Sequence, residues 1–191
     1  MAINWLPFNN NMTLYLSSYA AKDTESFVDF FITQLNVVLL TATTPTGNIV
    51  LAPNLIKIAK PLSANLMAER ITGYKNDNNT IKTLELIATY IGNGMVGTVL
   101  SPIPSIPPTI LPNPLLIPCV ITSPGDVKGL ATDLKRSLST NQSIKTPPMA
   151  VKLMELSLRK YLLTVGGVYN GLVYVGTATL PAPPIPWTGL L

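Results

Sequence analysis

The sequence predicts an α+β fold of amphipathic helices, short strands and extended proline-rich arms. Charged residues make up only 12% of the 191 positions and gather mainly in segments of helical periodicity. Short runs of β-branched and aromatic residues, bounded by glycine or proline, alternate with those segments. The 18 prolines are interspersed with isoleucine and leucine, whereas disordered proline-rich tracts are normally polar. These three observations together favour an ordered chain of mixed class.

Five segments have apolar residues at helical spacing. The first begins at Asp23 and Thr24, which are candidate N-caps, and the third ends at Gly92 as its predicted C-cap. The last starts with proline and ends with glycine, an asymmetry that is common in helices. The predicted helices are 22–40, 63–74, 78–92, 125–139 and 147–167.

Four short segments between turn residues are rich in β-branched and aromatic side chains, which is typical of strands. The predicted strands are 47–53, 95–100, 116–122 and 171–180. Residues 101–118 and 181–186 are predicted to be extended and polyproline-like, because proline fixes φ and removes the donors of a sheet. The single cysteine, Cys119, excludes an internal disulfide, and its apolar neighbours favour a buried thiol.

Gly92, Gly94 and Gly97 form a Gly-x-Gly-x-x-Gly pattern. A dinucleotide site requires a strand before such glycines and a helix after them, so that the helix N-terminus faces the pyrophosphate. Here a predicted helix precedes the pattern, so the negative end of its dipole would face the loop. We therefore expect Gly92 and Gly94 to turn the chain out of the helix, 95–100 to form a strand and 101–118 to run extended against protein.

Residues 96–108 align without a gap with 175–187, and seven of the 13 positions are identical. Tyr90 matches Tyr169 at the same shift, and each copy follows a charged helical segment. The match favours an internal duplication that gives two similar halves, although proline-rich tracts also match one another by composition. The expected parts of one compact domain are 1–75 with a long helix, 76–118 as a helix–strand–proline-rich unit, and 119–191 as a second, longer unit of that kind.

The composition is too poor in charge for an ordinary free monomer. Apolar residues reach 47% and the mean hydropathy is +0.37, so other subunits or a membrane should cover much of the surface. The most apolar segments are 30–44 and 109–121, but polar residues interrupt the first and prolines the second, so we expect no membrane span. Subunit contacts are the better explanation. A membrane-associated or apolar-ligand-binding protein is the alternative.

The residue inventory indicates no catalytic, cofactor or metal site. Histidine is absent, which excludes Ser-His-Asp and Cys-His systems and the usual histidine-containing zinc sites. Asp23, Glu25 and Asp29 are typical of a helix N-terminus. An enzyme built on carboxylates and lysines would need a cleft with a pair such as Lys82 and Glu85, which a contact on one helix face explains more simply.

The net charge of +4 comes from lysines and arginines that are scattered along the chain. Because they form no basic run with interleaved aromatic residues, we expect no specific nucleic-acid binding. We also expect no small-molecule substrate.

Large apolar and aromatic residues in the predicted strands and arms are the candidates for subunit contacts, because such side chains bury much area in interfaces. Trp5 and Trp187, near the two ends of the chain, are also expected to dock those ends. The interface candidates are Trp5, Val96, Val99, Ile103, Ile106, Ile110, Leu111, Tyr174, Ile185 and Trp187.

The segments YIGNGMVGTVLSPIP (90–104) and YNGLVYVGTATLPAPP (169–184) each place glycine, then Val-Gly-Thr, then a proline-rich stretch after a helical segment. In this unit, roughly the last 110 residues resemble small virion structural proteins of tailed bacteriophages, of the neck, tail or baseplate type. The resemblance implies a non-enzymatic subunit of a virion that is assembled in the host cytoplasm. Its partners would be copies of itself and other virion structural proteins.

Overall fold

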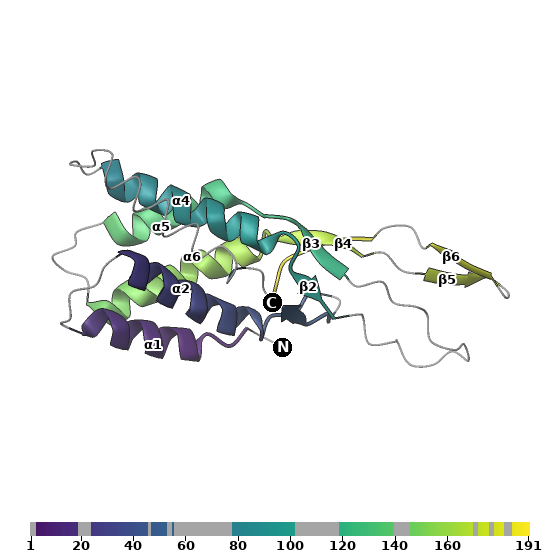
Figure 1. Cartoon of the computed structure of the whole chain (residues 1–191), viewed down its shortest axis with the longest axis horizontal. Helices are drawn as coiled ribbons and strands as arrows, with labels where there is room; N and C mark the ends of the chain where they lie inside the picture. The colour runs from purple at the N-terminus through teal and green to yellow at the C-terminus, as the bar shows by residue number, and fades with distance from the viewer. Residues whose placement is uncertain are drawn as a thin grey trace.

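The computed structural model describes residues 3–18, 24–45, 47–52, 55, 78–101, 119–139, 146–169, 172–175, 178–181 and 185–191. Within these residues, helices gather at one end, a small antiparallel sheet lies beside them, and a two-stranded hairpin projects on the far side of the sheet (Figure 1). The predicted α+β class is confirmed.

The described helices are α1 (Leu6–Ser17), α2 (Thr24–Leu39), α4 (Asn78–Met95), α5 (Val127–Ser139) and α6 (Pro147–Leu162). The last four confirm the predictions at 22–40, 78–92, 125–139 and 147–167, whereas the predicted helix at 63–74 lies outside the described residues. The sequence did not predict α1, because asparagine is a weak helix former and three follow one another at 9–11.

Five strands form one sheet in which every neighbouring pair is antiparallel. In spatial order they are β1 (Val50–Ala52), β2 (Val99–Leu100), β3 (Cys119–Ser123), β4 (Gly166–Tyr169) and β7 (Ile185–Thr188). The remaining strands, β5 (Leu172–Val175) and β6 (Ala178–Pro181), pair only with each other among the described strands. The strands predicted at 47–53 and 116–122 are confirmed by β1 and β3, whereas the single strand predicted at 171–180 is two strands, β5 and β6, that pair with each other.

The sequence did not predict β4 and β7. Gly166 and Gly167 were expected to end the helix at 147–167, but α6 ends at Leu162 and the glycines begin β4. A Cβ on Gly167 would lie 2.7 Å from the carbonyl oxygen of Val120 and 2.9 Å from Cζ2 of Trp187, so glycine allows this close packing. β7 falls partly in the predicted polyproline-like stretch, and it tolerates Pro186 because β4 is its only strand neighbour.

Thr43 joins the two outer strands of the sheet. Its N–H donates to the carbonyl of Leu191 at 3.0 Å, and its carbonyl accepts from the N–H of Leu191 at 2.8 Å. On its other side Thr43 pairs with Ile49 in an antiparallel bridge. Ile49 adjoins β1 and Leu191 lies three residues after β7, so residues 42–44 connect the two sides of the sheet through these neighbouring residues.

The core lies between the helices and continues under the sheet. α2 is the most buried of the described helices and contributes a row of apolar side chains. Trp5, Phe8 and Phe31 fix α1 on α2 through edge-to-face contacts, with ring centroids 5.6 and 5.9 Å apart. The buried side chains of α2 that form the core are Val28, Phe31, Ile32, Leu35, Val38 and Leu39.

The glycine pattern differs from the prediction. Gly92 and Gly94 lie inside α4, so the predicted C-cap at Gly92 is wrong, and only Val99 and Leu100 of the predicted strand 95–100 are in β2. A Cβ on Gly92 would collide with Cγ2 of Val127, so the absence of a side chain lets α4 and α5 approach closely. Gly97, with φ of 82°, is the residue that turns the chain toward β2.

The structure does not place the two aligned segments in equivalent positions. Tyr90 lies in α4, whereas Tyr169 ends β4. Among the described elements a helix followed by a strand occurs three times, as α2–β1, α4–β2 and α6–β4, and the last two have links of equal length at 96–98 and 163–165. Much of the aligned segments 96–108 and 175–187 lies outside the described residues, so the duplication stays a prediction.

A buried carboxylate holds α1 against α6. Glu155 is fully buried and accepts hydrogen bonds from Asn9 at 2.7 Å, Lys152 at 2.7 Å and Arg159 at 2.5 Å. Arg159 also stacks over the ring of Trp5, 5.3 Å from its centroid. Burial by itself would raise the pKa of Glu155, but the hydrogen bonds from Lys152, Asn9 and Arg159 and the charge of Arg159 outweigh it and lower the pKa.

Replacement of Gly92 tests the close approach of α4 and α5. Gly92→Ala should lower the free energy of unfolding by about 1–3 kcal/mol through overpacking, although alanine favours a helix by about 1 kcal/mol over glycine. In urea unfolding, Val127→Ala in the same chain should recover most of this loss. The control is Gly97→Ala, which should cost about 1 kcal/mol through its positive φ and gain nothing from Val127→Ala. A Gly92→Ala protein as stable as the wild type would contradict the contact.

Replacement of Glu155 tests the polar link between α1 and α6. Glu155→Gln should lower the free energy of unfolding at pH 7 by about 1–3 kcal/mol, less than for a wholly buried pair because water screens the exposed ends of Lys152 and Arg159. Since the folded-state pKa of Glu155 lies below its ordinary value of 4.5, its contribution is present above that pH and is lost below it.

The stability difference between wild type and Glu155→Gln should therefore shrink as the pH falls below 4.5, as urea unfolding across a pH series will measure. The matched control is Glu85→Gln, which removes an exposed carboxylate of α4 and should change stability by less than about 0.5 kcal/mol. A difference that stays constant down to pH 3 would show that the charge of Glu155 is not what stabilises the contact.

Candidate interaction surfaces

Among the described residues, the side chains with a shifted pKa are Glu155 and Tyr161. The described residues contain no group of three or more His, Cys, Asp or Glu side chains that could hold a metal ion. Glu155 has a lowered pKa, the opposite of what a general acid at neutral pH requires. Burial raises the pKa of Tyr161, and its hydroxyl donates to the carbonyl of Pro124 at 2.6 Å. Neither group is poised to transfer a proton.

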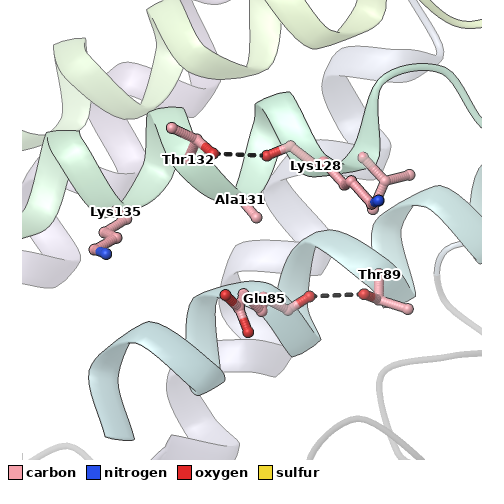
Figure 2. A pocket seen from close by; sticks show the side chains of 7 residues that line it. Glu85, Thr89, Lys128, Ala131, Thr132 and Lys135 are labelled. Carbon is pink, nitrogen blue, oxygen red and sulfur yellow. Dashed lines mark hydrogen bonds between the residues drawn. The ribbon is translucent and has the colours of Figure 1, made fainter. Parts of the chain in front are cut away.

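One groove, of about 420 Å³, lies between α4 and α5 (Figure 2). Glu85 and Thr89 line it from α4, whereas Lys128, Thr132 and Lys135 line it from α5, together with Val127 and Ala131. The hydroxyls of Thr89 and Thr132 donate to carbonyls of their own helices, at 2.8 and 3.0 Å. Two ammonium groups and one carboxylate around an open groove provide no specific ligand geometry, so its lining is typical of a solvated helix junction.

A second groove, of about 550 Å³, lies between α1 and α6. The two helices run antiparallel, because Trp5 meets Arg159, Asn9 meets Glu155, and Leu14 shares the groove with Pro148. Asn10, Thr13, Val151 and Lys152 also line it. This groove adjoins the Glu155 network on one side and the outer face of α6 on the other.

The outer face of α6 carries large apolar side chains. Met149, Leu156 and Leu163 are 52%, 51% and 53% exposed and follow one another at intervals of seven residues. We call these three residues the α6 stripe. The sheet has exposed apolar side chains of its own at Ile49 and Leu51, and Leu191, which pairs with Thr43, is a third.

The β5–β6 hairpin is an insertion between two strands that already pair. Tyr169 at the end of β4 lies opposite Ile185 at the start of β7, so the chain leaves the sheet and re-enters it at one place. Residues 170–184, which we call the arm, contain β5 and β6 and no charged side chain. Figure 1 shows the hairpin well away from the helices, beyond the sheet.

The structure separates the predicted interface residues into three groups. Trp5 and Trp187 are 3% and 7% exposed, so they dock their segments in the core and offer little area to a neighbour. Val96 is exposed after α4, Val99 is half-buried in β2, and Tyr174 and Ile185 lie in β5 and β7. The other four candidates lie outside the described residues: Ile103, Ile106, Ile110 and Leu111.

The sequence contained a signal for the α6 stripe that the prediction did not use. Met149, Leu156 and Leu163 lie at a spacing of seven residues. Apolar residues are so frequent in 147–167, however, that the sequence alone does not distinguish a buried face from an exposed stripe; the packing of α6 on the other helices does. The arm was recognised only as a strand, because the pairing of Tyr169 with Ile185 is a tertiary fact.

Among the described residues, no helix has the length and apolar character needed to cross a membrane. Comparison of the chain with protein-family models, with curated proteins and with solved structures finds no match.

Proposed function

We propose that the chain is a non-enzymatic structural subunit of a large symmetric protein assembly. The observation that carries the proposal is the β5–β6 hairpin, which pairs with no other described strand and projects beyond the sheet (Figure 1). A single two-stranded hairpin is at best marginally stable in water. Because the arm has no charged residue, burial against another protein surface would stabilise it through the hydrophobic effect.

The low charge of the chain supports the same conclusion. Charged side chains ordinarily make up about a quarter of the residues of a soluble domain, and 12% is about half of that share. Two of the acidic side chains, Glu155 and Asp133, are engaged in ion pairs in the helical body. Exposed apolar residues such as Leu51 and Leu156 therefore lie on a surface that neighbours would cover in an assembly.

We further propose that this assembly is a tailed-phage virion, with the chain in its neck, tail or baseplate. The support is the resemblance of the segments at 90–104 and 169–184 to small virion structural proteins. In this proposal the chain assembles in the host cytoplasm, and its partners are other copies of itself and further virion structural proteins.

Removal of the arm tests the assembly role. Residues 170–184 can be replaced by Asn-Gly, because Tyr169 and Ile185 are already opposite each other and a two-residue type I′ turn joins such a pair. The variant should keep the circular dichroism spectrum and melting temperature of the parent. In analytical ultracentrifugation the parent should sediment as a large species at micromolar concentration, whereas the variant should sediment as a monomer or a smaller species.

The matched control replaces the same segment by a Gly-Ser stretch of equal length, which keeps the chain length and removes the apolar side chains. It should assemble as poorly as the Asn-Gly variant. A parent that remains monomeric at high concentration would overturn the proposal. Flotation of the parent with liposomes would instead support the alternative, a lipid-binding protein.

A further inference from the structure

The α6 stripe is not part of the core of its own chain. Seven residues are about two turns of an α-helix, so Met149, Leu156 and Leu163 lie along one line. The buried side chains of α6, among them Met154 and Leu158, lie on the opposite side. A surface helix ordinarily has polar residues on its solvent face, so an apolar line on the exposed side of α6 indicates a contact with another molecule.

Positive charges flank the α6 stripe. Lys152 and Arg159 border it on the side of α1, and Lys160 borders it on the side of α5, where it bonds Asp133 at 2.7 Å. The carboxylates of these pairs are buried or nearly so, whereas the cations are exposed. A partner would therefore meet mainly cations beside the stripe. Two copies of α6 would repel each other, and an acidic apolar helix would be complementary.

The exposed face of α2 has that character. Asp29, Thr33 and Val37 of α2 and Leu40, the residue after its end, are exposed and follow the helical repeat, while the other described side chains of α2 are buried or half-buried. The acid lies toward the start of this line and the two large apolar residues lie toward its end. Among the other described helices, α1 has no acidic residue and the exposed side chains of α5 are mainly basic. The exposed line of α4 also has an acid, Glu85, but polar Thr89 and Asn93 follow it within the helix.

We propose that the α6 stripe of one copy docks against the exposed face of α2 from a second copy, with the two helices antiparallel. This orientation places Asp29 beside Lys160 and Leu40 beside Met149. Asp29 and Leu40 are eleven residues apart, and so are Met149 and Lys160. At a rise of 1.5 Å per residue each separation is about 16 Å, so both contacts can form together. The inference rests on the proposed role as an assembly subunit and specifies how its copies meet.

The contact joins two different surfaces, so it is heterologous. Each copy that uses its α6 stripe on one neighbour keeps its α2 face for another neighbour. Such contacts generate a closed ring where the rotation closes and a filament where it does not. Either outcome contains more than two copies, whereas a contact of α6 with α6 would stop at a dimer.

Cross-linking between single-cysteine proteins tests the pairing. In a Cys119→Ala background, Leu40→Cys protein is mixed with Met149→Cys protein and oxidised, and the mixed disulfide is measured on a denaturing gel. The antiparallel arrangement predicts this disulfide in high yield. The matched control mixes Leu40→Cys with Leu163→Cys, which should give at least tenfold less. Efficient cross-linking of the control pair, or of Met149→Cys with itself, would overturn the proposal.

A second pair of variants separates this contact from assembly in general. Leu156→Glu should shift the sedimenting species to smaller sizes and leave the melting temperature unchanged. The control is Leu51→Glu, at a position of similar exposure on β1, which should leave the α2–α6 cross-link intact. If the parent assembles and neither the cross-link nor the effect of Leu156→Glu is observed, the α2–α6 contact is wrong and the assembly role stands. If the parent is monomeric, both are wrong.

Discussion

The pairing of Thr43 with both Ile49 and Leu191 is the constraint on which the rest of the structure depends. It connects positions 148 residues apart, and it places residues 42–44 between Ile49, next to β1, and Leu191, which follows β7. Strands of two to five residues are weak elements when they have free edges, and this pairing adds partners beside both outer strands. Because β4 and β7 pair along their whole length, the arm leaves the sheet at a defined place.

In the helical end, the carboxylates of the ion pairs lie between helices, whereas several large apolar side chains are exposed. Glu155 is a fully buried carboxylate that accepts from Asn9 of α1 and from Lys152 and Arg159 of its own helix, and Asp133 binds Lys160 across α5 and α6. Met149, Leu156 and Leu163 are meanwhile exposed on the outer side of α6. The described ion pairs therefore serve the fold, while part of the exposed surface is apolar.

Element type was predictable wherever a segment had a strong period of its own, as in α2, α4 and α5. Prediction failed where tertiary contacts decide. Gly92 is an ordinary C-cap signal in sequence, and only the approach of Val127 explains why it lies inside a helix. Gly166 and Gly167 were assigned to a helix end because glycine commonly follows a helix. What places them in β4 is packing against the ring of Trp187, twenty residues further along the chain from Gly167, which the local sequence does not show. The arm and the exposed position of the α6 stripe depend on tertiary contacts too, so composition alone did not locate them.

Because of the place where the arm leaves the sheet, its length can change with little effect on the stability of the fold. Tyr169 and Ile185 are held opposite each other by the β4–β7 ladder, so the ends of the intervening segment are already together. Doubling the length of such a loop costs only about 0.6 kcal/mol in closure entropy. Insertions and deletions within 170–184 can therefore change the length of the arm while the sheet and the helical body remain as they are. The length of this segment can vary at this position without a change in the fold.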